Sequence, residues 1–310
     1  MQISSSNLRH LQTGYNALFN KAFAETPVFY SKVAMEVNSE SSQEVYAWLG
    51  AMPSMREWIG DRIVKALAQY DYTIKNKDFE LTVSIPVNAV MDDTYGVYSP
   101  VFQDLGYSAK RNPDKLIFSL FPKGFSEKCF DGKPFFSDSH KDKLGGKNAL
   151  IQSNKGTYRL TPDSYGAARA QMMALTNYEG DSLCIIPDLL VVAPQKEAMA
   201  RRILLSEEIN DETNPYKGTA EPLVVPELSA NPEQWFLLCT KRPVRPFIFQ
   251  NRQKPEFAVK NRPEDDNVFF QNEYIYGVKS RCNAGYGLWQ LAFGSTGAED
   301  YPTAEDYPTT

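Results

Sequence analysis

The chain has 310 residues, 42% of them hydrophobic and 23% charged, as in a globular protein with one large domain or two modest ones. Its net charge of −5 argues against a DNA-reading surface, because phosphate contacts need clustered lysine and arginine. No stretch approaches the roughly twenty apolar residues of a membrane span, and the first residues lack a secretory h-region. We therefore expect a soluble protein made in the cytoplasm, with no membrane partner.

Residues 1–44 are polar, rich in serine and dotted with aromatic side chains. Within them, residues 8–23 carry Leu11, Tyr15, Leu18 and Ala22 on one stripe, which predicts a helix. Ser6 or Asn7 can cap its first turn. The whole segment holds too little apolar surface to fold alone, so we expect an arm.

Residues 45–90 predict an extended excursion of strand, helix and strand. The first strand covers residues 45–49, and the helix begins at Ser54, which forms an S-x-x-E capping box with Glu57. Residues 72–85 then alternate in polarity, which favours one or two strands. This excursion has a thin apolar face, so we expect it to contact another chain.

Residues 98–121 predict a long helix, because apolar side chains recur on one face over almost six turns. Pro113 removes one hydrogen bond of the helix and clashes with the preceding turn, which predicts a kink near Asn112. Alternatively, Asn112 caps a second helix with Pro113 at its first position.

From Thr161 onward the pattern is that of mixed helix and sheet. Helices are predicted to begin at Thr161 and to span residues 195–205. Buried strands are predicted at residues 182–186 and 189–193. The later segments read as short strands broken by prolines, at residues 222–225, 235–239, 247–250 and 257–260. A last strand pair, residues 274–279 and 286–293, flanks a turn at CNAG.

The chain ends in two tandem copies of AEDYPT, at residues 298–303 and 304–309. The segment is acidic, contains proline and is poor in apolar residues, which predicts disorder. A tail that tolerates tandem duplication and a displayed docking peptide are both compatible with the repeat.

Few residues suggest chemistry. Asp138, His140 and Asp142 alternate along FSDSHKD, so an extended segment would point them the same way toward a divalent ion. The alternative is a set of solvated loop residues, since the segment shows no further ligands. Four cysteines lie far apart without a CxxC pair, which predicts reduced thiols and makes zinc binding improbable. They are Cys129, Cys184, Cys239 and Cys282.

One basic stretch is interleaved with aromatic residues and prolines. It comprises Lys241, Arg242, Arg245, Arg252 and Lys254. Such cations contact nucleic acid, face solvent or form ion pairs between subunits. No nucleophile elbow or complete phosphate-binding loop occurs, so catalysis is unsupported.

Several pieces in order and spacing resemble the major head subunit of Mu-like tailed phages. They are YAWLGAMPSMREWIGDR at 46–62, NKDFE at 76–80, YGVYSPVFQDLGYSA at 95–109, PDKLIF at 113–118 and CFDGKPFFSDSH at 129–140. A weaker likeness follows in LLVVAPQKEAMARRILL at 189–205, which is similar to a segment of phage capsid A-domains.

The resemblance implies an α+β chain with the tailed-phage major capsid fold of the Hong Kong 97 type. It divides the chain into an N-arm at 1–44, an E-loop at 45–90 and a P-domain at 91–159, with the spine helix at about 98–121. An A-domain at 160–262, a return to the P-domain at 263–296 and a disordered acidic tail at 297–310 follow.

The resemblance further implies a capsid protein, not an enzyme and without a cofactor, that assembles as hexamers and pentamers into an icosahedral shell around double-stranded DNA. The implied partners are a scaffold protein, a portal, possible decoration proteins and non-specifically packaged DNA. The virion is the implied location, with assembly in the host cytoplasm. The alternatives are an encapsulin-type nanocompartment and, from another class, a metal-dependent hydrolase that uses Asp138 and His140.

Buried aromatic residues dominate interface energies, so we expect Trp48 and Trp58 to anchor contacts between subunits. They can equally staple the helix of the excursion to its own strand. Arg62, Phe79 and Glu80 complete the set of interface candidates.

Overall fold

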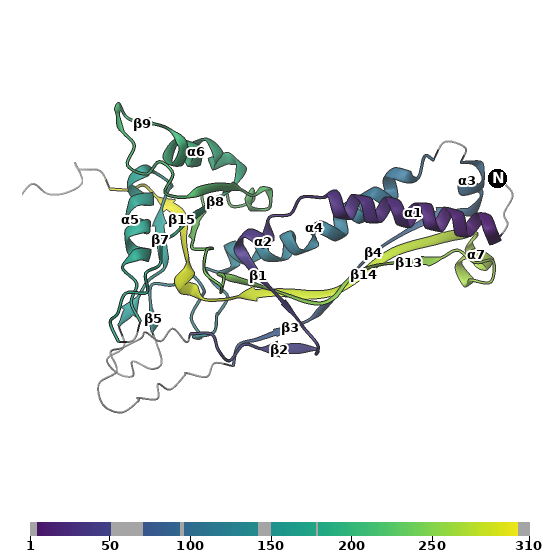
Figure 1. Ribbon diagram of the computed structural model, residues 1–310, viewed down its shortest axis with the longest axis horizontal. Helices are drawn as coiled ribbons and strands as arrows, with labels where there is room; N and C mark the ends of the chain where they lie inside the picture. Colours follow the sequence, from purple (N-terminus) through teal and green to yellow (C-terminus); the bar gives the residue numbers. More distant parts are fainter. Residues whose placement is uncertain (1–4, 51–70, 94–95, 142–149, 178, 303–310) are drawn as a thin grey trace, which may run out of the picture.

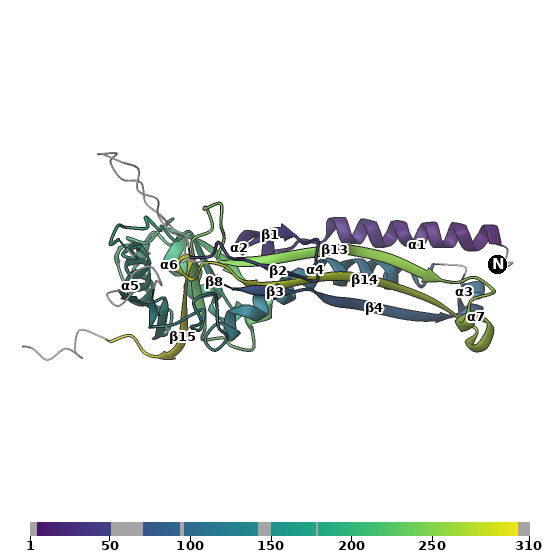
Figure 2. The same cartoon turned by 90° about the horizontal axis from the view of Figure 1, so that it is seen from below.

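The computed structural model describes residues 5–50, 71–93, 96–141, 150–177 and 179–302. The protein is elongated, with a long four-stranded sheet and its helices along most of its length and a five-stranded sheet at one end (Figures 1 and 2). No helix in the described ranges is long and apolar enough to cross a membrane.

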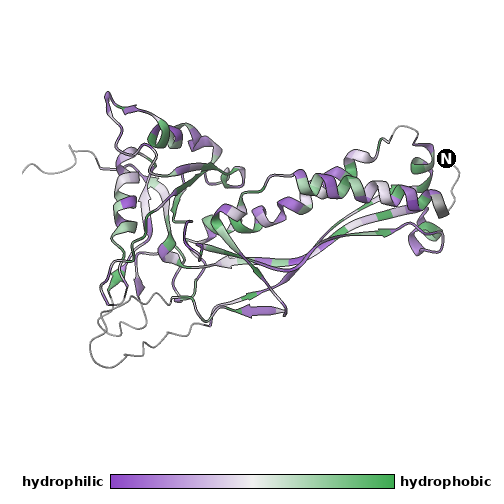
Figure 3. Cartoon of the chain, viewed as in Figure 1, coloured by the Kyte–Doolittle hydropathy of each residue, from purple (hydrophilic) through white to green (hydrophobic). Residues whose placement is uncertain are grey.

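The long sheet has the strand order β1-β13-β14-β4. Its strands are β1 Ala34–Asn38, β13 Phe247–Lys260, β14 Glu273–Tyr286 and β4 Lys77–Pro86. β1 runs parallel to β13, with Ala34 opposite Phe247, whereas the other two pairs are antiparallel. Hydrophobic and hydrophilic residues interleave along these strands (Figure 3), as expected for a sheet with two different faces.

Two sequence predictions about this sheet are wrong. Residues 247–250 and 257–260 belong to one strand, β13, because the pairing with β14 is irregular between Gln253 and Glu256 and thereby accommodates Pro255. β14 likewise continues through CNAG, where Asn283 and Ala284 pair with Gln250 and Phe249. β13 therefore lies in the long sheet, although the predicted A-domain range of 160–262 includes it.

Two helices cover the long sheet: α1, Ser5–Glu25, and α4, Ser99–Lys123. Both helices were predicted from their apolar stripes, and both are confirmed with slightly longer bounds. They bury Tyr15 and Phe102, whose rings stack with centroids 3.8 Å apart, against Tyr276 of β14. α4 continues through Pro113, so the alternative of a second helix capped by Asn112 is wrong. A kink at that point stays a prediction.

The five-stranded sheet has the order β11-β8-β12-β15-β7. Its strands are β11 Glu221–Val224, β8 Leu189–Val192, β12 Trp235–Leu238, β15 Ala292–Glu299 and β7 Lys155–Tyr158. Every residue of β8 and β12 is buried, which explains their unbroken apolar sequence. Helices α5, Pro162–Met173, and α6, Glu197–Leu205, accompany this sheet, and the Thr161 side chain caps α5 as predicted.

The predicted strand at residues 182–186 is absent. Ser182 makes one isolated bridge to Thr176, and Cys184 has a φ of 49°, which no regular strand tolerates. Leu183 and Ile185 are nevertheless buried, so the apolar alternation indicated burial correctly but not backbone pairing.

The two sheets share an aromatic core at the end of α4. The ring of Phe121 stacks on Phe247 of the long sheet, with centroids 4.4 Å apart, and meets Phe236 of the five-stranded sheet edge-on at 4.9 Å. Phe135, from the segment after α4, stacks on Tyr286 at 4.6 Å. The helix thereby joins the two sheets.

The remaining elements are short. They are α2 Tyr30–Val33, β2 Gln43–Val45, β3 Thr73–Lys75, α3 Val87–Asp92, β5 His140–Lys141, β6 Ile151–Gln152, η2 Pro194–Lys196, β9 Glu208–Ile209, β10 Glu212–Thr213, η3 Pro226–Leu228, α7 Asp266–Gln271 and η4 Trp289–Leu291. β2 pairs with β3, and the strand predicted at residues 45–49 ends at Val45, because Leu49 donates its N–H back to Tyr46 in a turn. The predicted helix from Ser54 lies outside the described residues.

Part of the acidic tail is ordered. Residues 297–299 form the end of β15, and beyond them Asp300 pairs with Arg159 at 2.8 Å. Tyr301 meets the ring of Tyr158 edge-on, with centroids 5.0 Å apart. Residues 303–310 lie outside the described residues.

Candidate subunit interface

Trp48 lies in the turn that follows β2, and its side chain is 40% exposed. Its ring meets that of Tyr46 edge-on at 6.3 Å, while the Tyr46 hydroxyl donates to Oε1 of the buried Gln250 at 2.9 Å. Tyr46 and the buried Leu49 thus fix the turn to the protein, and Trp48 is left on its surface. Trp58 and Arg62 lie outside the described residues.

Phe79 and Glu80 lie on β4, which is the edge strand of the long sheet. Together with Leu81 they border a cavity of about 250 Å³ whose opposite wall is α4. Phe79 is half-buried, whereas Glu80 is exposed and accepts a hydrogen bond from the Thr82 hydroxyl at 2.5 Å. An edge strand with exposed side chains is a surface on which another chain can pair.

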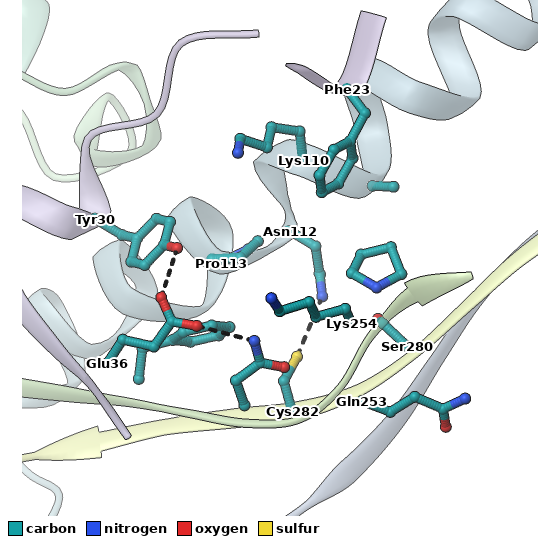
Figure 4. Close-up of a pocket in the computed structure, with 14 residues that line it drawn as sticks. Phe23, Tyr30, Glu36, Lys110, Asn112, Pro113, Gln253, Lys254, Ser280 and Cys282 are labelled. Atoms are coloured by element: carbon teal, nitrogen blue, oxygen red, sulfur yellow. Dashed lines mark hydrogen bonds between the residues drawn. The ribbon is translucent and has the colours of Figure 1, made fainter. Parts of the chain in front are cut away.

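A second cavity of about 250 Å³ lies between α4 and the β13–β14 pair, near the end of α1 (Figure 4). Glu36 accepts hydrogen bonds there from the Tyr30 hydroxyl at 3.4 Å and from Asn251 at 2.9 Å. Burial, reinforced by the charge of Glu36, raises the pKa of Tyr30 to about 12. Lys110 and Lys254 add two positive charges to the lining.

Sequence reasoning missed one exposed apolar feature. Phe269 and Phe270 on α7 are 76% and 77% exposed, and their rings meet edge-on at 5.0 Å. α7 lies at the end of the long sheet that is remote from the five-stranded sheet (Figures 1 and 2). The available signal was a pair of adjacent phenylalanines inside the otherwise polar segment NRPEDDNVFFQNE.

The structure does not bring Asp138 and His140 to one accessible centre. Asp138 is exposed, whereas His140 is fully buried, and its ring stacks on Trp289 at 4.0 Å. Asp142, the third predicted ligand, lies outside the described residues. The prediction of a shared centre is therefore wrong for the two described residues, because core packing takes His140 away from solvent.

The ring nitrogens of His140 are both engaged. Nδ1 lies 2.5 Å from Oδ2 of Asp131, and Nε2 lies 3.1 Å from Oδ1 of Asn154. Burial raises the pKa of Asp131, but the hydrogen bond and charge of His140 outweigh that effect and lower it overall.

Cys129 completes the one described set of donor atoms that lie near enough for a metal, within 4.8 Å of one another. Its thiol is 3.2 Å from Oδ1 of Asp131, and burial raises its pKa. The three groups satisfy one another, and their arrangement is that of a structural cluster.

Three arginines of the basic stretch donate to backbone carbonyls of this chain. Arg242 bonds to Leu183, Arg245 to Ser31 and Arg252 to Ser39. The stretch therefore serves partly to join loops, which a linear sequence does not reveal. Lys241 and Arg245 also border a cavity of about 490 Å³ beside α2.

Comparison with known proteins finds matches along nearly the whole chain. The sequence matches the family described as Mu-like prophage major head subunit gpT over residues 8–159, 150–228 and 227–306. It is 30% identical to the major capsid protein of Escherichia phage Mu, over 96% of this chain and 76% of that protein. It is 29% identical to the Mu-like prophage FluMu major head subunit of Haemophilus influenzae, over 94% and 73%.

A solved structure shares the fold. The procapsid of bacteriophage JBD30 contains a chain that matches with a TM-score of 0.61 and 30% identity, over 98% of this chain and 78% of that one. The fold is thus the α+β phage capsid fold of the Hong Kong 97 type.

Proposed function

Because the chain belongs to the Mu-like prophage major head subunit gpT family, we propose that its copies assemble as hexamers and pentamers into an icosahedral shell around double-stranded DNA. The protein is a major capsid protein and part of a virion, and its family is structural, not enzymatic. The observation that carries the proposal is the family match from residue 8 to residue 306, joined to a fold shared with a phage procapsid chain.

The proposal assigns roles to the parts of the chain. Residues 1–44 are the N-arm, 45–90 the E-loop, 91–159 the P-domain with α4 as its spine helix and 160–262 the A-domain. Residues 263–296 return to the P-domain, and 297–310 form the tail. What supports this division is the separation of the two sheets and the position of α4 along the longer one. The sheets require two amendments. β13 adds residues 247–260 to the P-domain, whereas β7 and β15 belong to the five-stranded sheet with the strands of the A-domain.

An elongated subunit suits a shell for a physical reason. A stable interface removes about 1,600 Å² from water in total, and each subunit of a closed shell makes several. Extended segments add contact area without enlarging the core. Closure then couples the contacts, so each one can be modest.

The interface candidates gain unequal support. Trp48 presents a large exposed ring on a turn that buried neighbours hold in place, and Phe79 and Glu80 lie on a sheet edge. We assign all three to contacts between subunits, together with Trp58 and Arg62 of the E-loop. Assembly takes place in the host cytoplasm with a scaffold protein, a portal and decoration proteins, and the packaged DNA is held without sequence preference.

The test is negative-stain electron microscopy of the chain expressed with its scaffold. We expect closed shells with fivefold and sixfold capsomers, and small monodisperse oligomers alone would contradict the proposal. Shells that form without any scaffold and retain a host enzyme would favour a nanocompartment of the same fold.

A further inference from the structure

The Phe269–Phe270 pair on α7 forms an exposed aromatic knob. Two adjacent aromatic rings exposed on one short helix form an apolar patch that another surface can cover. The knob is also rigidly held. Asn267 donates to the carbonyls of Lys260 and Glu273 at 3.1 and 2.7 Å, which fastens α7 to both β13 and β14. A rigid aromatic side chain loses little conformational entropy on binding.

The cavity beside Pro113 has the size and lining to receive such a ring (Figure 4). Apolar surface comes from Phe23, Pro113 and Phe249. Its volume is about 250 Å³, and an apolar cavity of about 150 Å³ already binds benzene. The cavity is open to solvent in the isolated chain, with Lys254 reaching into it.

The charges around the knob and around the cavity are opposite in sign. Glu264, Asp265 and Asp266 lie three to five residues before Phe269. The cavity is bordered by Lys110 and Lys254, and its one described acid, Glu36, is engaged by Tyr30 and Asn251. The acidic residues that precede the knob therefore complement the lysines that border the cavity.

We propose that α7 of one copy inserts one ring of its phenylalanine pair into the cavity beside Pro113 on a second copy. The inference rests on the proposed function, which brings copies of the chain together. α7 cannot fill the cavity of its own chain, because α7 lies at the far end of the long sheet (Figures 1 and 2), whereas the cavity is bordered by Pro113 of α4 and by Phe249 near the start of β13.

The arrangement can be reciprocal. Two copies related by a twofold axis, with their long sheets antiparallel, each place α7 against the cavity of the other. Both contacts then form together, and the second becomes intramolecular once the first has formed. The interface is therefore stronger than either contact alone.

Photo-crosslinking in assembled shells tests the contact directly. With p-benzoylphenylalanine in place of Phe270, we expect crosslinks to peptides of another copy that contain Pro113, Lys254 or Cys282. The same probe at the exposed Met173 of α5 is the control and should not label these peptides. Crosslinks confined to other surfaces, or none in intact shells, would overturn the inference alone. Failure of the unaltered chain to form shells would instead refute the proposed function.

A charge exchange tests the same contact without a bulky probe. Glu264→Lys and Lys254→Glu should each weaken association by about tenfold, and the double variant should restore it. Lys128→Glu, an exposed charge reversal in the segment after α4, is the matched control and should assemble normally. Circular dichroism confirms that each variant is folded. Single variants that assemble like the unaltered chain, or a double variant no better than either single one, would overturn the inference.

Discussion

The Nδ1 atom of His140 and the Oδ2 atom of Asp131 lie 2.5 Å apart inside the protein, nine residues from each other in the sequence. Asn154 fixes the orientation of the ring, because its Nδ2 lies within 3.1 Å of three carbonyl oxygens and its Oδ1 is left to accept from Nε2. The buried contact between Asp131 and His140 therefore closes the segment after α4.

Asp131→Asn should lower the free energy of unfolding by about 1–3 kcal/mol, because it removes the carboxylate that contacts His140 inside the protein. The folded-state pKa of Asp131 lies below the ordinary value of 3.8, so its contribution is complete above that pH and is lost as the pH falls through the folded pKa. Chemical denaturation at several pH values measures both effects. Asp138→Asn, on an exposed neighbour, should change stability by less than about 0.5 kcal/mol. Equal effects of the two variants would contradict the assignment.

Asp114 of α4 accepts the backbone N–H groups of Phe29 and Tyr30 at 3.0 and 2.7 Å and so holds the start of α2. Asp114→Ala should cost about 1–3 kcal/mol, since two donors lose their partner, and Asp114→Asn should cost less because it keeps an acceptor oxygen. Thermal unfolding of both variants distinguishes these outcomes.

The contribution of Asp114 to stability depends on pH in the opposite direction to that of Asp131. Burial raises its pKa, against the lowering effect of the two N–H groups, so the folded state binds the proton more tightly. Its contribution is complete below the ordinary value of 3.8 and declines as the pH rises through the folded pKa. In Asp114→Asn, the decline in stability with rising pH should disappear. The free energy of unfolding should then show only the opposite pH dependence that comes from Asp131.

Gly106 of α4 lets α1 approach closely. A Cβ atom there would lie 2.4 Å from the carbonyl oxygen of Phe19, so Gly106→Ala should separate the helices and cost about 1–3 kcal/mol. Gly14 of α1 is the matched control, because a Cβ there meets nothing within 4 Å. Gly14→Ala should stabilise by about 0.5–1 kcal/mol, since glycine is unfavourable inside a helix. Urea denaturation compares the two, and a stabilising Gly106→Ala would show that the helices do not touch there.

Trp48→Ala should reduce the yield of shells while changing the stability of the isolated subunit by less than about 1 kcal/mol, because much of the ring faces solvent. Tyr46→Phe provides the contrast. It removes the hydrogen bond to Gln250 inside the protein and should cost about 1 kcal/mol of stability with little change in the exposed surface. Sedimentation separates shells from free subunits. Unchanged assembly of Trp48→Ala would remove that residue from the interface.

Local pattern predicted the helices well. α1, α4 and α5 were all recognisable, because a stripe of side chains at helical spacing and an N-cap such as Thr161 are local properties. Long strands were less accessible. Pro255 and CNAG look like interruptions in a linear sequence, yet β13 and β14 pass through both, because irregular pairing at Gln253 and Glu256 is set by the partner strand.

For the candidate sites too, the local sequence pattern was informative in part, and tertiary packing decided the rest. An alternating acid–histidine–acid segment indicated metal chemistry, and only packing revealed that His140 turns inward to Asp131 and Trp289. The Phe269–Phe270 knob passed unnoticed, since adjacent phenylalanines are usually core residues and only the tertiary structure exposes them.

By itself the sequence determined the family, the longer described helices and the burial of the apolar segments, because ordered motifs and local periodicity are written along the chain. Only the tertiary structure decided which strands join into one long sheet, which titratable groups are buried as pairs and which aromatic rings stay exposed. Those properties depend on contacts between residues far apart in the sequence, such as Phe121 with Phe247, and no local pattern encodes them.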